Sequence, residues 1–340
     1  MNGNLGKFQI GLKNYLKINN MEFLVAGYEI IEQKPGLQGV YEACELPGRI
    51  CYGSQDKIEP GSAEPFVKRL MKSNHGAPLE HGTIYLKAEY QYSYYSNTDV
   101  IYDGNPLEHY ENNPYSKFIR ENNMVYVTTN LRVLVENDWM DDLYYFCEPT
   151  EYHEKRVMVR FTMDRFTGEE FLRHRKASFN RESTRYVAFT KEKFGGGSIK
   201  YIIPTWMLDR TDEIDDFKNM SIVDFCRNVI DIENGDMECI SDIFVWGFAL
   251  KATEWSYNKL MNSYDWKAQQ ARTVLPCAIN SPLIKTAFIS DWKHFFNLRA
   301  IGTTGAPHPQ AKELAEPLMY EFAKKGYITL DNTKQIEKNV

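Results

Sequence analysis

The stretch RHRKASFNRESTRY, residues 173–186, is the most informative part of this sequence. Within it, basic side chains stand among hydroxyl and amide groups; they are Arg173, His174, Arg175, Arg181 and Arg185. Guanidinium groups bind phosphate through paired hydrogen bonds, and hydroxyls complete a phosphate shell without adding charge. The stretch therefore predicts a site for a phosphorylated small molecule. The alternative interpretation is a solvated basic strip that pairs with the acidic surface.

The composition of the rest of the chain limits the partners of such a site. The 340 residues include 40 Lys and Arg against 46 Asp and Glu, a formal charge of −6. This balance gives no global basic field for nucleic acid, so an anion site has to be local. Apolar runs fall short of the roughly 20 residues that span a bilayer, and the N-terminus lacks the apolar core of a signal peptide. We expect a cytoplasmic protein without nucleic-acid or membrane partners. The spacing of the cysteines predicts no metal site.

Hydrophobic periodicity predicts a mixed fold. Alternating apolar residues indicate strands at 83–95 and 155–163, with a further strand candidate at 124–135. Three- and four-residue spacing indicates helices at 62–73, with Ser62 as N-cap, at 221–274 and at 308–325. We expect one α+β domain over residues 1–340, with a central antiparallel or mixed sheet and a helical half. The segment 96–150, rich in turn formers at 96–117, is interpreted as a surface insertion.

Further motifs occur around the basic stretch in a fixed order. They are Gly48-Arg-Ile-Cys-Tyr52, Leu79-Glu-His81, Ala271-Arg-Thr-Val-Leu-Pro276 and Trp292-Lys-His-Phe-Phe-Asn-Leu-Arg299, the last followed by His308-Pro-Gln310 and Glu313. Together with Arg173-His-Arg175, Ser183 and Arg185-Tyr186, this series resembles the motifs of the flavin-dependent thymidylate synthases. The resemblance runs from about residue 48 to residue 316 and leaves residues 96–150 uncovered.

This resemblance implies a fold, a reaction and an assembly. The fold would be that of the family, and the chain would form a homotetramer whose flavin and nucleotide sites are shared between subunits. The enzyme would transfer methylene from 5,10-methylenetetrahydrofolate to C5 of dUMP and release dTMP, with NADPH supplying reducing equivalents through FAD. The cofactor carries the redox chemistry in such an enzyme, so the protein mainly positions rings and neutralises phosphates.

The resemblance also implies roles for individual residues. The positions that match flavin contacts are Cys51, His81, Thr83, Arg173, His174, Arg175 and His294. Those that match the nucleotide site are Glu170, Arg173, Arg181, Ser183, Arg185, Arg272 and Arg299. Arg299 would stabilise charge on the uracil carbonyls, which makes it the main catalytic expectation. Ser183 is expected to bind and activate dUMP, since a serine without a dedicated base is a weak nucleophile.

Two residues depart from the family pattern, and two alternatives stay open. Arg181 stands where the family commonly has Glu, and Glu170 where a Gln often precedes the motif. One alternative is therefore a flavin-binding relative that acts on another pyrimidine nucleotide. The other is a nucleotide- or nucleic-acid-binding module that uses the basic stretch without catalysis; its affinity for DNA would fall steeply with salt.

Overall fold

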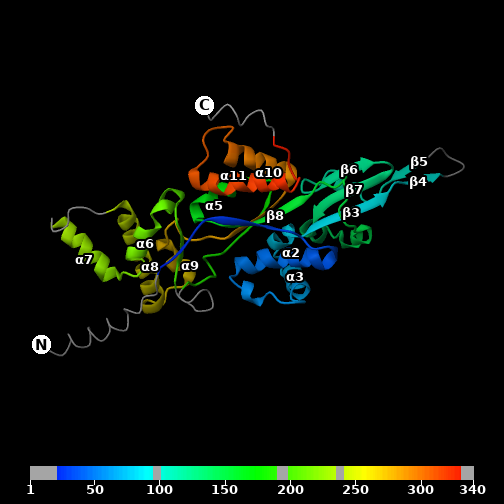
Figure 1. The fold of residues 1–340 in the computed structure, drawn as a ribbon. Coiled ribbons are helices and arrows are strands. Elements are labelled where there is room, and N and C mark those ends of the chain that lie inside the picture. Colours follow the sequence, from blue (N-terminus) through cyan, green and yellow to red (C-terminus); the bar gives the residue numbers. More distant parts are fainter. Residues whose placement is uncertain (1–20, 95–100, 190–197, 235–240, 331–340) are drawn as a thin grey trace, which may run out of the picture. The chain divides into compact units, whose positions relative to one another are not determined.

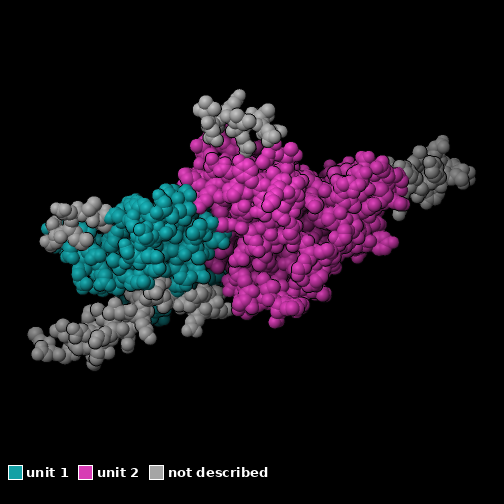
Figure 2. Space-filling view, viewed as in Figure 1, with its two compact units in different colours: residues 1–26, 162–168, 183–281 teal, residues 27–161, 169–182, 282–340 magenta. Residues whose placement is uncertain are grey.

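The chain folds into two compact units. The structure, a computed structural model, describes residues 21–94, 101–189, 198–234 and 241–330. Unit 1 comprises residues 1–26, 162–168 and 183–281, and unit 2 comprises residues 27–161, 169–182 and 282–340 (Figure 2). The single domain expected over residues 1–340, with an insertion at 96–150, stays a prediction.

Unit 1 is mainly helical (Figure 1). Its elements are β1 (Glu22–Leu24), β10 (Lys200–Ile202), η6 (Thr205–Arg210), α6 (Thr211–Phe217), α7 (Ile222–Glu233), α8 (Asp242–Ser263), α9 (Ala268–Ala271) and η7 (Arg272–Val274). Strands β1 and β10 pair in parallel. Serines start both long helices: Ser221 accepts from the backbone N–H of Asp224, and Ser241 from that of Phe244. The helices expected over 221–274 are thus confirmed where the structure describes that range, and residues 235–240 lie outside the described residues.

Unit 2 holds most of the strands. Its elements are β2 (Gly27–Ile31), α2 (Gly36–Cys51), η1 (Gln55–Lys57), α3 (Ala63–Lys72), η2 (Ala77–His81), β3 (Thr83–Glu89), β4 (Gln91–Tyr94), β5 (Ile101–Gly104), η3 (Glu108–Tyr110), β6 (Lys117–Glu121), β7 (Met124–Asn130), α4 (Leu131–Glu136), η4 (Met140–Tyr145), β8 (Arg156–Thr162), α5 (Arg165–Phe171), β9 (Ser178–Arg181), β11 (Leu283–Phe288), α10 (Ile289–Phe296), the π-helical turn η8 (Asn297–Ile301) and α11 (Pro309–Lys324). Helix α5 begins in the residues of unit 1, and β8 ends there. The strand predicted at 155–163 and the last helix are confirmed.

A four-stranded sheet in the order β2-β8-β11-β9 positions the candidate site. Strand β11 is antiparallel to both β8 and β9, and every residue of β11 is buried. Because successive side chains of a strand point to opposite faces, Lys285 and Thr286 serve different layers. Lys285 faces the aromatic rings of α10, and Thr286 contacts His81 at the end of η2. The two faces of β11 thus organise two different polar clusters.

A second sheet, β3-β7-β6, shares a hydrophobic core with α2 and α3. The register is antiparallel throughout, with Thr83 opposite Asn130. Fully buried side chains of Leu107, Tyr110, Val127 and Leu131 belong to this core. These side chains fill the space between the sheet and the helices, while the interpretation of 96–150 as a surface insertion stays a prediction. Residues 96–100 of that segment lie outside the described residues.

Three local details complete the comparison with the sequence. The strand expected at 124–135 ends at Asn130, whose side chain accepts from the N–H of Val133 and starts α4. Ser62 stands at the N-cap of α3 but makes no capping hydrogen bond; its hydroxyl donates to Glu45 instead. Within the described residues, no helix is long and apolar enough to cross a membrane.

Candidate active site

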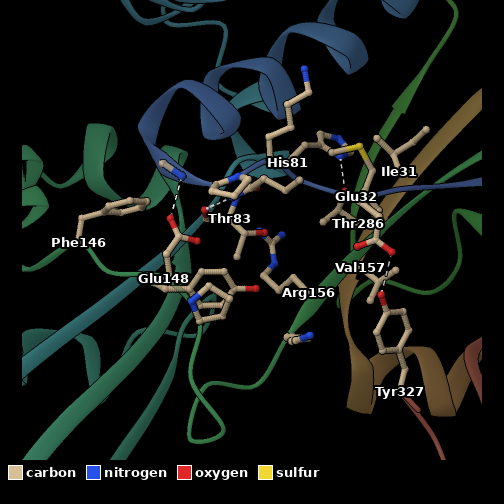
Figure 3. A pocket seen from close by; sticks show the side chains of 18 residues that line it. Ile31, Glu32, His81, Thr83, Phe146, Glu148, Arg156, Val157, Thr286 and Tyr327 are labelled. Carbon is tan, nitrogen blue, oxygen red and sulfur yellow. Dashed lines mark hydrogen bonds between the residues drawn. The ribbon is translucent and has the colours of Figure 1, made fainter. Parts of the chain in front are cut away.

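His81 lies at the end of η2, in unit 2, and is 1% exposed. Its Nδ1 is 2.7 Å from Oγ1 of Thr286 (Figure 3). Its Nε2 is 3.3 Å from Oδ1 of Asn180. An amide oxygen can only accept, so Nε2 carries the proton and Nδ1 accepts from the Thr286 hydroxyl. Burial, with the positive charge of Arg156 as a second cause, lowers the pKa of His81 to about 3. The ring is therefore neutral at physiological pH.

Asn180, on β9, joins His81 to the end of α2. Its Nδ2 lies 3.1 Å from Sγ of Cys51 and 3.3 Å from the carbonyl oxygen of Pro47. Burial raises the pKa of the Cys51 thiol, so Cys51 is protonated and is not a poised nucleophile. Two expected flavin-contact residues, Cys51 and His81, thus share one partner. Gly82, next to His81, lets the chain pack closely on α2, because a Cβ there would stand 2.5 Å from Sγ of Cys44.

Thr83 opens β3 and borders a cavity that His81 also lines. Its backbone is fixed from both sides: its N–H donates to Oε1 of Gln33 at 2.8 Å, and its carbonyl accepts from Nε2 of the same residue at 2.9 Å. Its hydroxyl accepts from Nη1 of Arg156 at 3.4 Å. The structure thus brings His81 and Thr83 to one cavity, and their role at the flavin stays a prediction.

The second cluster of unit 2 centres on Arg299, in the π-helical turn after α10. Its Nη1 lies 2.5 Å from Oε2 of Glu170, and its Nη2 donates to the Glu170 carbonyl oxygen at 3.1 Å. Its Nε donates to Nε2 of His174 at 3.2 Å. Three residues expected at the substrate or the flavin are therefore in direct contact. Glu170 neutralises Arg299 locally and fixes the plane of the guanidinium from the side chain and the backbone together.

His174 is neutral as well, for partly different reasons. Burial, followed by the nearby charges of Lys285 and Arg299, lowers its pKa to about 3. Since its Nε2 accepts from Arg299, its proton resides on Nδ1. The ring packs edge-on against Phe295, and the exposed ring of His294 lies 5.9 Å away between centroids. His174 and His294 thus lie together, and their assignment to the flavin stays a prediction.

Lys285 lies near this cluster, against the aromatic rings of α10. It is fully buried, and within the described chain its Nζ has no hydrogen-bond partner. Nζ lies 3.8 Å from the ring centroid of Phe295 and 4.1 Å from that of Trp292. Burial holds the pKa of Lys285 well below its usual range. The side chain is an aromatic-caged amine behind the Arg299 cluster.

The remaining basic residues of the signature behave differently from one another. Arg173 and Arg175 are exposed. Arg181 pairs through Nη2 with Oε1 of Glu169 at 2.9 Å, which engages the residue that departs from the family pattern. Its role in substrate binding stays a prediction.

Unit 1 carries the other expected nucleotide residues. The N–H of Arg185 donates to Oγ of Ser183 at 3.3 Å, and Nε of Arg185 donates to Gln269 on α9 at 3.2 Å. Arg272 follows α9 directly and is exposed. Within the described chain, Ser183 Oγ has no imidazole or carboxylate partner. Among the described residues of unit 1, this serine therefore has no base beside it.

The sequence motifs predicted no individual role for several residues that the structure brings to these clusters. They are Asn180, Thr286, Lys285 and Arg156. A signal existed for two of them, since Lys285 and Thr286 are polar residues within the otherwise apolar run LIKTAF at 283–288. Asn180 lies inside the basic stretch itself.

The chain resembles a known family and several solved structures. Residues 151–325 match the family model described as thymidylate synthase complementing protein. No curated protein sequence matches the chain. A UMP/dUMP methylase, PolB from Streptomyces cacaoi with 5-Br dUMP, is similar at 19% identity over 89% of this chain and 93% of that one, with a TM-score of 0.36. ThyX from Helicobacter pylori with FAD and dUMP is similar at 12% identity over 87% and 92%, with a TM-score of 0.31. Both scores are too low to bear on function.

The family match spans more than half of the chain and includes Glu170, His174, Ser183 and Arg299. It confirms the resemblance that the ordered motifs indicated. The chain belongs to the thymidylate synthase complementing protein family, that of the flavin-dependent thymidylate synthases.

Proposed function

We propose that this protein is a flavin-dependent thymidylate synthase. It would convert dUMP to dTMP with methylene from 5,10-methylenetetrahydrofolate and reducing equivalents from NADPH passed through FAD. The observation that carries the proposal is the contact of Arg299 with Glu170 and His174, because it assembles matched positions from two distant motifs at one point. Family membership supplies the reaction class.

Arg299 is the residue we propose for charge stabilisation on the uracil ring. A guanidinium has five N–H groups, and within the described chain Arg299 uses one on each nitrogen, for Glu170 and His174. One N–H on each terminal nitrogen is thus left for a ligand. Glu170 and His174 hold the group in place beforehand, which lowers the cost of reorganisation when charge develops on a carbonyl oxygen.

The flavin-side residues fit a ring-bearing, phosphorylated cofactor. His81 and Thr83 border one cavity, Arg173 and Arg175 present exposed guanidinium groups, and His174 and His294 present neighbouring rings. FAD, when bound, supplies the redox chemistry. The chain's own residues would orient the ring system and neutralise the phosphates, and the neutral His174 would hold Arg299 rather than donate a proton.

Ser183, Arg185 and Arg272 are proposed for the nucleotide phosphate and ribose. The short distance along the chain from Ser183 to Arg185, and the contact of Arg185 with α9 just before Arg272, support a common role within unit 1. Because Ser183 has no base beside it, we propose binding and activation and not nucleophilic attack.

Ligand binding tests the proposal before any turnover is measured. The purified protein should carry or take up FAD and show its visible absorption, and dUMP should perturb that spectrum. UMP, dTMP and single-stranded DNA are the comparison ligands. A protein that binds UMP and ignores dUMP would point to the related activity on another pyrimidine nucleotide. A colourless protein that binds DNA in a salt-sensitive manner would overturn the proposal.

The family resemblance also leads us to propose a homotetramer with sites shared between subunits. Light scattering on the FAD-loaded protein measures the assembly directly. A stable monomer that still binds FAD tightly would contradict shared sites.

A further inference from the structure

Unit 2 contains a cavity of about 260 Å³ between the start of α2, the start of β3 and the strands β8 and β11. Pockets that hold drug-sized ligands have volumes of roughly 300–1,000 Å³, so this cavity suits a small group or one end of a longer ligand. Figure 3 shows Arg156 and Thr83 pointing toward one another within it. The lining is polar at its centre, which separates this cavity from an ordinary packing defect.

Arg156 is a cation in the lining that forms no ion pair within the described part of the chain. Its Nη2 donates to Oγ of Ser178 at 3.0 Å, and its Nη1 donates to Oγ1 of Thr83 at 3.4 Å. Both acceptors are neutral hydroxyls, which hold the guanidinium in place without cancelling its charge. Burial lowers the pKa of Arg156 to about 10, so it stays protonated at neutral pH.

The two acidic residues of the cavity are already engaged. Glu32 accepts from Nζ of Lys325 at 3.1 Å and from the hydroxyl of Tyr327 at 3.0 Å. Glu148 accepts from the backbone N–H of Gly36, the first residue of α2, at 2.9 Å. Lys155 adds a further positive charge to the lining. The lining therefore holds three cations, Lys34, Lys155 and Arg156, against the two carboxylates Glu32 and Glu148, so its net charge is positive.

The hydrogen-bonding roles of the hydroxyls narrow the ligand class. The Thr286 proton is committed to Nδ1 of His81. The Thr83 hydroxyl accepts from Arg156 and keeps its own proton for another acceptor. A group that meets both Arg156 and Thr83 therefore needs several acceptor oxygens and a negative charge. Phosphate meets this need, and a guanidinium fork matches its geometry.

We infer that this cavity binds a phosphate group, with Arg156 as its charged contact and the Thr83 hydroxyl beside it. One source of the phosphate is FAD, since His81 and Thr83, the expected flavin contacts, line the same cavity; with that source the inference rests on the proposed function. The other source is a separate phosphate-bearing ligand, which needs no thymidylate synthesis.

The experiment compares three ligands on the full-length protein after removal of bound small molecules. Riboflavin lacks phosphate, FAD contains two, and pyrophosphate is the free anion. Arg156→Met removes the charge and keeps much of the side-chain volume, and Arg120→Met, an exposed arginine outside the cavity, is the matched control. We expect Arg156→Met to weaken a phosphate ligand about 10- to 100-fold, the loss typical of a hydrogen bond to a charged group, and to leave riboflavin affinity unchanged.

Two results support the inference and identify the source. If Arg156→Met weakens FAD, and pyrophosphate competes with FAD for the wild type, the phosphate belongs to the flavin dinucleotide. If pyrophosphate binds the FAD-saturated protein in an Arg156-dependent way, the phosphate belongs to another ligand. Unchanged affinity for both FAD and pyrophosphate, relative to Arg120→Met, would overturn the inference.

Two safeguards keep the outcome interpretable. Should Arg156→Met fail to fold, Arg156→Lys keeps the charge but loses the fork; we expect a several-fold loss of FAD or pyrophosphate affinity, and full affinity for both would again overturn the inference. Measuring thymidylate formation separates the two claims. If the wild type makes dTMP but Arg156→Met leaves FAD and pyrophosphate affinity unchanged, only the phosphate site in the cavity is refuted. If pyrophosphate binding depends on Arg156 but no dTMP forms, only the proposed reaction is refuted.

Discussion

His81 and His174 are both neutral histidines in unit 2, yet their surroundings differ. Burial is the main reason why each has a pKa of about 3. His81 is 1% exposed and forms hydrogen bonds with the neutral groups of Asn180 and Thr286. His174 is partly exposed and accepts from the charged guanidinium of Arg299.

Because their surroundings differ, the two neutral histidines have different roles. His81 carries its proton on Nε2 and connects η2, β9 and β11, so it is part of the framework. His174 carries its proton on Nδ1 and holds a cation that has N–H groups left for a ligand. We therefore expect changes at the His174 cluster to affect turnover, and changes at the His81 network to affect folding first.

Removing the cation of the His174 cluster should have the largest effect. We expect Arg299→Ala to lower kcat for dTMP formation at saturating dUMP about 10²- to 10³-fold, because one positioned donor to a developing oxyanion is lost. FAD content, read from flavin absorbance, should be retained. Arg120→Ala serves as the control. Unchanged kcat in Arg299→Ala would remove Arg299 from the reaction.

Removing the His81 side chain should act on stability instead. His81→Phe leaves the Asn180 oxygen and the Thr286 hydroxyl buried without their partner, which should lower the free energy of unfolding by about 1–3 kcal/mol. His174→Phe should cost less, since His174 is partly exposed and Glu170 still holds Arg299. Urea denaturation of both variants provides the measurement. Equal losses would show that the two histidines do not differ as described.

The pH dependence of stability sharpens the same contrast. The unfolded chain protonates His81 near its ordinary pKa of 6.5, whereas the folded chain does so only near pH 3. The unfolded state binds more protons between these values, so stability should fall as the pH drops, by about 1.4 kcal/mol per pH unit. His81→Gln should remove this contribution, and His174→Gln a smaller one because solvent screens it. An unaltered slope in His81→Gln argues against a neutral His81.

Ser183, whose hydroxyl oxygen accepts from the backbone N–H of Arg185, should show the smallest effect of these variants. Ser183→Ala should weaken dUMP binding by about 0.5–1.5 kcal/mol, the net value of one hydrogen bond, and dTMP should still form at saturating dUMP. Titration of dUMP against the flavin spectrum, followed by product analysis, measures both effects. Loss of all product with FAD and dUMP still bound would make Ser183 a nucleophile.

The family and several helices and strands could be predicted from the sequence, whereas the side-chain contacts of the motif residues could not. The order of the motifs indicated the family, and hydrophobic periodicity located β8 and α11, because both signals are local. Asn180 and Thr286 could not be assigned to His81 in the same way, since 99 and 205 residues separate the partners. In the sequence, Arg156 lies at the start of an ordinary predicted strand. Only the fold shows that its guanidinium bonds two neutral hydroxyls and has no carboxylate partner among the described residues.

The segment 96–150 shows the limit of a local composition. Its turn-forming residues led to the prediction of a surface insertion, and the structure buries Tyr110, Val127 and Leu131 in the core beside β3. Turn composition reports the local backbone and carries no information on which apolar side chains fill a distant space.

Product analysis with labelled folate tests the central claim most directly. The FAD-loaded protein is incubated with NADPH, an equimolar mixture of dUMP and UMP, and 5,10-methylenetetrahydrofolate that carries ¹³C in its methylene group. The account predicts dTMP that carries the label, NADPH oxidation that accompanies its formation, and no such product from Arg299→Ala on the same time scale. Absence of labelled dTMP from a fully FAD-loaded wild type, or label in a methylated UMP alone, would contradict it.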